Sequence, residues 1–67
     1  MNIILNNREE IIEKETLTVR ELLSVKNFTF KMLVIKINGK LVKKDAYDIA
    51  TITEGDNVIV LHLVSGG

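Results

Sequence analysis

The stretch VIVLHLVSGG at residues 58–67 carries the strongest indication of the fold. Residues 58–64 are almost continuously apolar, which is typical of a strand buried in the middle of a sheet. The stretch then ends in Ser65, Gly66 and Gly67. Glycine has no Cβ, so its backbone can pass through a slot too narrow for any other residue. The pattern predicts a rigid strand followed by a flexible Gly-Gly tail, whose slim carboxylate another protein could reach and modify.

The composition predicts one small domain, residues 1–67, that folds around an apolar core. A chain of this size buries only about 60% of its unfolded surface, so it is near the lower limit for folding without disulfides, metals or oligomerisation. The chain contains no cysteine, which excludes disulfides, a thiolate nucleophile and cysteine-based zinc sites. Its hydrophobic content of 46% is sufficient for a compact core.

Charge and hydropathy indicate where such a domain acts. Nine basic and nine acidic residues cancel, so no net field favours nucleic acid or an anionic membrane as a partner. The apolar stretches are far shorter than the roughly 20 residues of a membrane span. Residues 1–6 lack the basic start and the cleavage site of a signal peptide. We therefore expect a cytoplasmic protein with neither a nucleic-acid nor a membrane partner.

The N-terminal part of the chain indicates two short strands. Residues 3–5 form the first, closed by an Asn-Asn pair at residues 6–7 that tolerates the left-handed conformations of tight turns. A second strand is expected around residues 10–14. Its only apolar residues are Ile11 and Ile12, and the pattern leaves open which of them faces inward.

A helix is predicted to begin at Thr18. Thr18 and Glu21 have the spacing of a capping box. Leu17 and Leu22 then occupy the positions of a hydrophobic staple, and Asn27 suits the left-handed residue that ends a helix. One apolar face of this helix is formed by Val19, Leu22 and Leu23.

The C-terminal half indicates a hairpin and a last strand. Residues 33–37 alternate as a strand does, and Asn38-Gly39 is the strongest short hairpin signal, since both residues of a type I′ turn need positive φ. Residues 41–42 return as a short strand, and residues 54–56 form a turn into the last strand. Between them, three residues are expected to attach an irregular segment to the core: Tyr47, Ile49 and Ile52.

The order of elements predicts an α+β fold with a mixed sheet of four to five strands and one helix packed on one face. A single helix must cover the sheet because no other element is available to do so. The long connection through the helix makes the first and last strands natural central neighbours in this sheet.

This order resembles the β-grasp arrangement of ubiquitin-like proteins, and the short tail resembles that of the prokaryotic sulfur carriers of the ThiS family. The resemblance covers essentially the whole chain. The chain departs from the family pattern at Ser65, where the family often has glycine or alanine, and at Lys43-Lys44, where Pro-Arg is common. The residues that carry the resemblance are the helix start Thr18-Val19 with Leu22-Leu23, the Asn38-Gly39 hairpin, Tyr47, the turn Glu54-Gly55-Asp56 and the terminal Gly66-Gly67.

The resemblance implies a sulfur carrier for the thiazole of thiamin, not an enzyme. An E1-like adenylating enzyme of the ThiF type would use ATP to adenylate the Gly67 carboxylate. A cysteine desulfurase system would supply persulfide sulfur, and the resulting Gly67 thiocarboxylate would be consumed by a thiazole synthase of the ThiG type. Ser65 and Gly66 would thread the partner's active site. No catalytic residue, bound cofactor or metal is expected on the carrier, which is expected to be a monomer when free.

A docking surface for these partners is expected on the sheet face away from the helix, as an uncovered apolar patch. The residues assigned to this docking face are Ile4, Val34, Val60, His62 and Val64. His62 shares a face with Val60 and Val64 on strand alternation, and a half-exposed strand residue is the favoured interpretation over a catalytic one. Tyr47 is interpreted as a core residue, and the acidic residues of 9–15 as a solvated edge, not a metal site.

Three other classes of protein remain open from the sequence. The first is the molybdopterin synthase small subunit, a β-grasp sulfur carrier that typically is longer and has prolines before its tail, whereas this chain has none. The second is a ubiquitin-like modifier that forms isopeptide bonds to lysines. The third is a plain β-grasp binding module for which the glycines are dispensable. An independent enzyme is disfavoured because no nucleophile, metal cluster or phosphate loop is visible.

Overall fold

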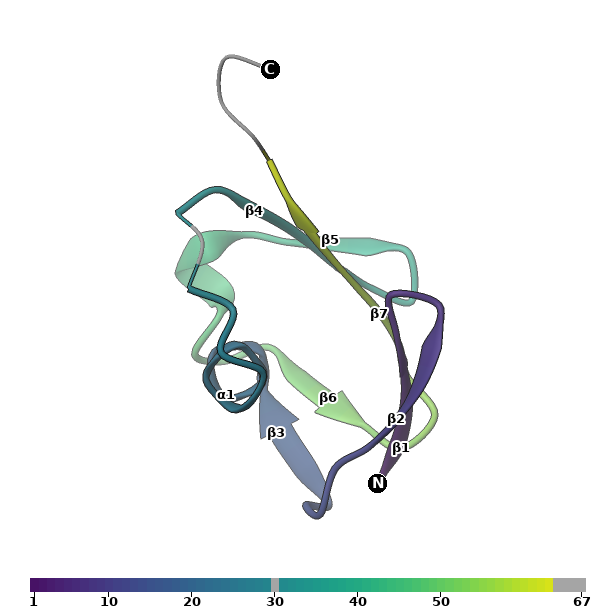
Figure 1. Cartoon of the computed structure of the whole chain (residues 1–67). Coiled ribbons are helices and arrows are strands. Elements are labelled where there is room, and N and C mark those ends of the chain that lie inside the picture. The colour runs from purple at the N-terminus through teal and green to yellow at the C-terminus, as the bar shows by residue number, and fades with distance from the viewer. Residues whose placement is uncertain (30, 64–67) are drawn as a thin grey trace.

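The computed structural model describes residues 1–29 and 31–63 (Figure 1). Its elements in chain order are β1 (Asn2–Leu5), β2 (Arg8–Ile11), β3 (Thr16–Thr18), α1 (Val19–Val25), β4 (Leu33–Ile37), β5 (Lys40–Val42), the 3₁₀-helix η1 (Lys44–Ala46), β6 (Thr51–Thr53) and β7 (Asn57–His62).

The main sheet has five strands in the order β2-β1-β7-β4-β5. β1 and β7 run parallel at its centre, and the other neighbours are antiparallel. The prediction that the first and last strands are central neighbours is therefore confirmed. The sequence did not indicate the second sheet, in which β3 pairs with β6 through the register Leu17↔Ile52.

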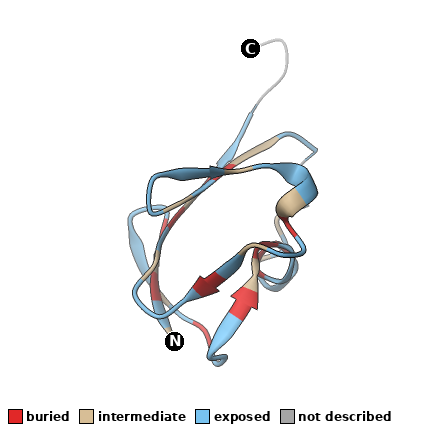
Figure 2. Cartoon of the chain, turned by 180° about the vertical axis from the view of Figure 1, so that it is seen from behind, coloured by how far each residue is buried: buried red, intermediate tan, exposed pale blue. Residues whose placement is uncertain are grey.

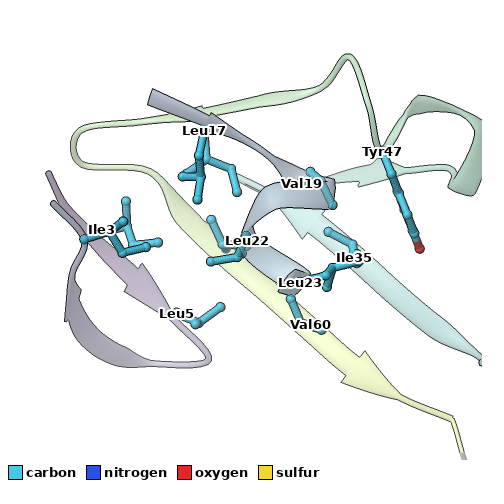
Figure 3. Packing of buried hydrophobic residues seen from close by; sticks show 12 residues of the cluster. Ile3, Leu5, Leu17, Val19, Leu22, Leu23, Ile35, Tyr47 and Val60 are labelled. Atoms are coloured by element: carbon cyan, nitrogen blue, oxygen red, sulfur yellow. The ribbon is translucent and has the colours of Figure 1, made fainter. Parts of the chain in front are cut away.

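The core lies between α1 and the inner face of the main sheet (Figures 1 and 2). Figure 3 shows the side chains of Leu22 and Leu23 on α1 beside Ile35 of β4 and Val60 of β7. Burial of such side chains is worth about 1.5–3 kcal/mol each relative to exposure, so this layer is the main source of stability. The buried core residues are Ile3, Leu5, Ile12, Leu17, Val19, Leu22, Leu23, Ile35, Tyr47, Ile52, Val58 and Val60.

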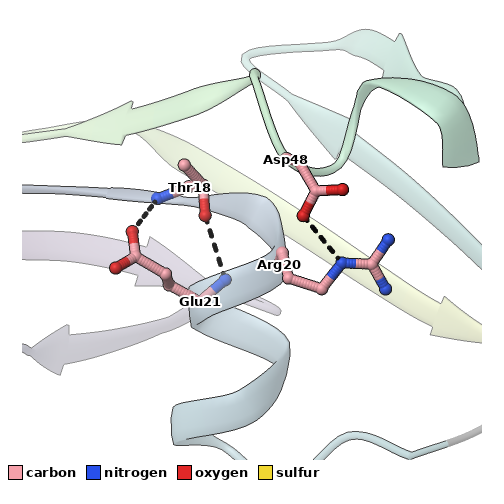
Figure 4. A network of polar contacts seen from close by, with 4 residues as sticks. All are labelled: Thr18, Arg20, Glu21 and Asp48. Atoms are coloured by element: carbon pink, nitrogen blue, oxygen red, sulfur yellow. Dashed lines mark hydrogen bonds and ion pairs between the residues drawn. The ribbon is translucent and has the colours of Figure 1, made fainter.

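Both ends of α1 are fixed as the sequence predicted. The Thr18 hydroxyl accepts the Glu21 N–H at 3.1 Å, and the Glu21 carboxylate accepts the Thr18 N–H at 2.8 Å (Figure 4). At the other end Asn27 is left-handed with φ of 57°. The Phe28 N–H then donates to the Leu23 carbonyl at 2.8 Å, which is the 6→1 hydrogen bond of a Schellman motif.

Asparagines form the left-handed positions of both hairpin turns in the main sheet. Asn6 and Asn7 have φ of 51° and 67°, and Asn38 and Gly39 have φ of 51° and 83°. The β4–β5 turn is also attached to the start of β7, because the Asn38 side-chain carbonyl accepts the Asn57 N–H at 2.9 Å. Both Asn-containing turns predicted from the sequence are confirmed.

The structure resolves the open pair Ile11 and Ile12 and confirms two expected core residues. Strand β2 runs over Arg8–Ile11, earlier than expected, and Ile12 is the buried member of the open pair at 7% exposure, against 77% for Ile11. The Ile12 N–H bonds to the Met1 carbonyl just after β2 ends, so its side chain turns inward. Tyr47 and Ile52 are core residues as expected.

The expectation for Ile49 is wrong. Its side chain is 76% exposed. The turn that follows η1 explains this, because the N–H groups of Ile49 and Ala50 both bond to the Ala46 carbonyl. This turn places the partly buried Ala50 against the core in its stead.

Candidate partner-docking face and tail strand

Strand β7 is held on one side up to Leu63, the last described residue, and on the other side up to Val60. On one side it pairs with β4, and the Leu63 N–H extends this ladder to the Met32 carbonyl at 3.0 Å. On the other side β1 ends at Leu5, and the Asn6 side-chain carbonyl accepts the Val60 N–H at 2.8 Å. The asparagine side chain therefore replaces a strand that has already ended, and β7 forms a firm base for the C-terminal tail.

The tail residues assigned a function lie outside the described residues. These are Val64, Ser65, Gly66 and Gly67. Their assigned roles, including modification at Gly67, therefore stay predictions. The structure describes the strand that leads to them and the surfaces that surround its end.

An apolar surface lies on the sheet face away from α1. Val34 is opposite Leu61 across the β4–β7 pair. Leu61 and Leu41 are 52% and 59% exposed, and no described element covers them. We call this surface the outer face, and its apolar members are Ile4, Ile11, Val34, Leu41, Ile59 and Leu61.

Two of the residues predicted for the docking face do not lie on it. Val60 is only 7% exposed and packs in the core beneath α1. Side chains alternate along a strand, so Val58 and Val60 face inward while Ile59 and Leu61 face outward. His62 shares the side of Val60, as predicted, but lies beyond the helix-covered core and is exposed.

The other predicted positions, Ile4 and Val34, do lie on the outer face. The sequence did not identify Ile59, Leu61 and Leu41 as their neighbours. The last strand is apolar on both faces, so its hydrophobic pattern contains no phase that distinguishes inside from outside. The polar residues at its two ends do not settle the phase, because Asn57 is on the side of Ile59 and His62 is on the side of Val60.

Charged residues of both signs lie on the outer face. Lys36 lies within it, between Ile59 of β7 and Leu41 of β5, and Glu9 of β2 is opposite Ile4 of β1. Protein–protein interfaces combine exposed apolar side chains with charged and polar ones. The outer face is therefore suited to docking another protein.

The described residues do not provide a candidate metal site. Among residues 1–29 and 31–63, no group of histidine, cysteine, aspartate and glutamate side chains could hold a metal ion, and no charged side chain is buried. Glu10 of the acidic N-terminal segment pairs with Lys26 at 3.0 Å. The Thr18 N–H, through its hydrogen bond in the capping box, lowers the pKa of the Glu21 carboxyl. Within the same described residues no helix is long and apolar enough to cross a membrane.

The sheet order, the single helix across one face and the central parallel pair define a ubiquitin-like β-grasp protein. A family model narrows this class, since the model of the ThiS family matches residues 2–67. The chain belongs to the ThiS family, whose members are small sulfur carriers of thiamin biosynthesis.

Two solved structures of one bacterial protein are similar to this chain over its whole length. The crystal structure of the thiamine biosynthesis protein ThiS from Geobacter metallireducens is 30% identical, with all of both chains covered and a TM-score of 0.90. The solution structure of a thiamine biosynthesis protein from Geobacter metallireducens is also 30% identical. It matches all of this chain and 88% of the other, with a TM-score of 0.81.

Proposed function

We propose that this protein carries sulfur as a thiocarboxylate on Gly67 and delivers it to the enzyme that builds the thiazole of thiamin. The family match through residue 67 carries the proposal. The position of β7 supports it, because a central strand with partners on both sides leads directly to the Ser-Gly-Gly sequence. A substrate residue on a firm support can be presented to an enzyme at a low cost in ordering entropy.

The first step is activation of the Gly67 carboxylate. A carboxylate resists nucleophilic attack because of its negative charge. A partner enzyme of the E1-like ThiF type transfers AMP from ATP to this carboxylate, which releases pyrophosphate and leaves a mixed anhydride. The glycines serve this step because a chain without side chains can enter a narrow cleft.

The second step exchanges oxygen for sulfur. A cysteine desulfurase system supplies sulfur as a persulfide. The terminal sulfur of this persulfide attacks the Gly67 carbonyl and displaces AMP. The product is an acyl disulfide, and a thiol then attacks its S–S bond. That attack releases the Gly67 thiocarboxylate and leaves a disulfide on the thiol-bearing partner. The carrier supplies the reacting carbonyl and no catalytic group, and it needs no cofactor of its own.

The outer face is the proposed docking surface for the adenylating enzyme and for the ThiG-type thiazole synthase. Support comes from exposed Leu41 and Leu61 beside the half-buried Ile4, Val34 and Ile59. Exposed apolar side chains gathered on one uncovered face mark a protein interaction site. The same surface can serve both partners in turn, since each must hold the carrier while the tail reaches its active site.

Intact-mass measurement tests the proposal. The protein is incubated with ATP, the adenylating enzyme and a persulfide donor. We expect a mass gain equal to replacement of one oxygen by one sulfur, localised to Gly67 by fragmentation. Omission of ATP is the control and should leave the mass unchanged. Isopeptide attachment to lysines with no sulfur gain would assign the protein to the modifiers instead.

A further inference from the structure

A groove with an apolar floor and a basic rim lies between α1, the start of β4 and η1. Its volume is about 910 Å³. Three exposed lysines, Lys31, Lys43 and Lys44, line its rim. The floor is formed by the buried or half-buried side chains of Leu23, Phe28, Leu33, Val42 and Tyr47.

The groove lies at the base of the tail. Leu63, the last described residue, lines it and is fixed there by its hydrogen bond to the Met32 carbonyl. The groove also reaches Val34 and Leu41, which belong to the outer face. The groove is therefore adjacent both to the outer face and to the base of the tail.

The three rim lysines are not engaged in close ion pairs within the described residues, and Asp45 of η1 is the acidic residue next to them in sequence. Lys31, Lys43 and Lys44 form no ion pair with any residue that the structure describes. The fourth cation of the groove, Arg20, differs because it pairs with Asp48 at 3.0 Å (Figure 4) and lies over the Tyr47 ring at 5.6 Å. The chain as a whole has no net charge, so the positive rim is a local feature at the tail end of the molecule.

We infer that the groove binds an acidic segment of the adenylating enzyme, whose apolar side chains cover the floor and whose carboxylates pair with the rim lysines. This inference rests on the proposed function. An acidic segment with apolar side chains matches both the charge of the rim and the apolar floor. Single-stranded nucleic acid would stack its bases on exposed aromatic side chains, whereas the described aromatic residues of the groove, Phe28 and Tyr47, are half-buried and buried.

Charge reversal at the rim tests this inference. The wild type is compared with the double variant K43E/K44E in ATP–pyrophosphate exchange catalysed by the adenylating enzyme. We expect the carrier concentration at half-maximal rate to rise about tenfold or more, because like charges now face each other across the interface. The rate at saturating carrier should stay within about twofold, because the lysines bind the partner and take no part in the chemistry. Half-saturation of the wild type should also rise with salt, and that of K43E/K44E should not.

Two control variants separate the groove from net charge. R8E/K40E makes the same change in charge at exposed residues that do not line the groove, and we expect half-saturation within about twofold of wild type. K43R/K44R keeps the positive rim and should behave as wild type. Thermal unfolding of all variants confirms that they are folded.

The possible failures are distinguishable. An unchanged half-saturation for K43E/K44E, or an equal loss for R8E/K40E, would overturn the groove assignment while leaving the proposed function intact. Absence of exchange with the wild type would overturn the proposed function itself. Loss of tRNA binding or of self-association in K43E/K44E, with half-saturation unchanged, would assign the groove to another partner and also overturn the inference.

Discussion

Val34 of β4 and Leu61 of β7 lie directly opposite each other on the sheet face that α1 leaves uncovered. The neighbours of Leu61 along β7 point to the other side of the sheet, where Val60 packs in the core at 7% exposure. One strand therefore supplies both the stability of the domain, through its inner side chains, and a recognition surface, through its outer ones. The two roles can be separated by substitutions at adjacent positions.

Leu61→Asp should impair partner binding without unfolding the domain. Leu61 is 52% exposed on the outer face, so an aspartate there remains solvated in the free protein but loses its hydration when an apolar partner surface covers it. We expect half-saturation in the adenylation assay to rise about tenfold or more, as for a residue that becomes fully buried in an interface. Ile49→Asp is the matched control, because Ile49 is 76% exposed away from this face. Equal effects of the two substitutions would contradict the docking assignment.

Val60→Ala should destabilise the fold, whereas Leu61→Ala should not. Removing the two methyl groups of a buried valine leaves a cavity under α1 and should cost about 1–3 kcal/mol. The half-exposed Leu61 leaves no cavity, and its truncation should cost less than about 1 kcal/mol. Urea unfolding of both variants measures the difference. A larger loss for Leu61→Ala would show that the inward and outward sides of β7 have been exchanged.

Thr18→Ala should weaken the start of α1. The Thr18 hydroxyl accepts the Glu21 N–H at 3.1 Å, and loss of such a cap costs about 1 kcal/mol, with a range of about 0.5–2. Thr18→Ser retains the hydroxyl and should remain within a few tenths of a kcal/mol of wild type, about the difference between serine and threonine caps. Chemical denaturation measures both values. Equal losses for alanine and serine would mean that the cap does not contribute.

The charge of Glu21 should give the domain a small, acid-sensitive increment of stability. The backbone N–H of Thr18 is the main cause that lowers the pKa of this carboxyl, and Lys14 at 3.6 Å adds to the effect. A carboxyl whose pKa is lower in the folded state than in the unfolded state stabilises the fold at pH values above its unfolded-state pKa. This contribution is lost as the pH falls through the folded-state pKa. Wild type should therefore exceed Glu21→Gln in unfolding free energy at neutral pH and converge with it in acid. A difference independent of pH would contradict this account.

Local chemistry made much of the fold predictable from the sequence. Thr18 and Glu21 specify a helix start, and Asn38-Gly39 specifies a hairpin, because each depends only on residues a few positions apart. The short β3–β6 pair was not predictable in this way. Its register, Leu17↔Ile52, joins residues distant in the sequence, and each strand spans only three residues.

The candidate site was predictable only in part for a related reason. Ile4 and Val34 were placed on the correct face, but Val60 was not, because a strand with apolar residues on both sides has no readable phase. The exposure of Ile49 likewise depends on hydrogen bonds to the Ala46 carbonyl after η1. The groove between α1 and η1 is a product of tertiary packing, although its paired lysines, Lys43 and Lys44, are visible in the sequence.

Deletion of Gly67 tests the central claim most directly. The core residues lie between Ile3 and Val60, so the shortened chain should unfold at the same temperature as the full chain. Mixed with ATP, the adenylating enzyme and a persulfide donor, the full chain should gain one sulfur in place of one oxygen and release pyrophosphate. The chain without Gly67 should do neither. Undiminished pyrophosphate release from the shortened chain would contradict the assignment of Gly67 as the residue that carries the sulfur.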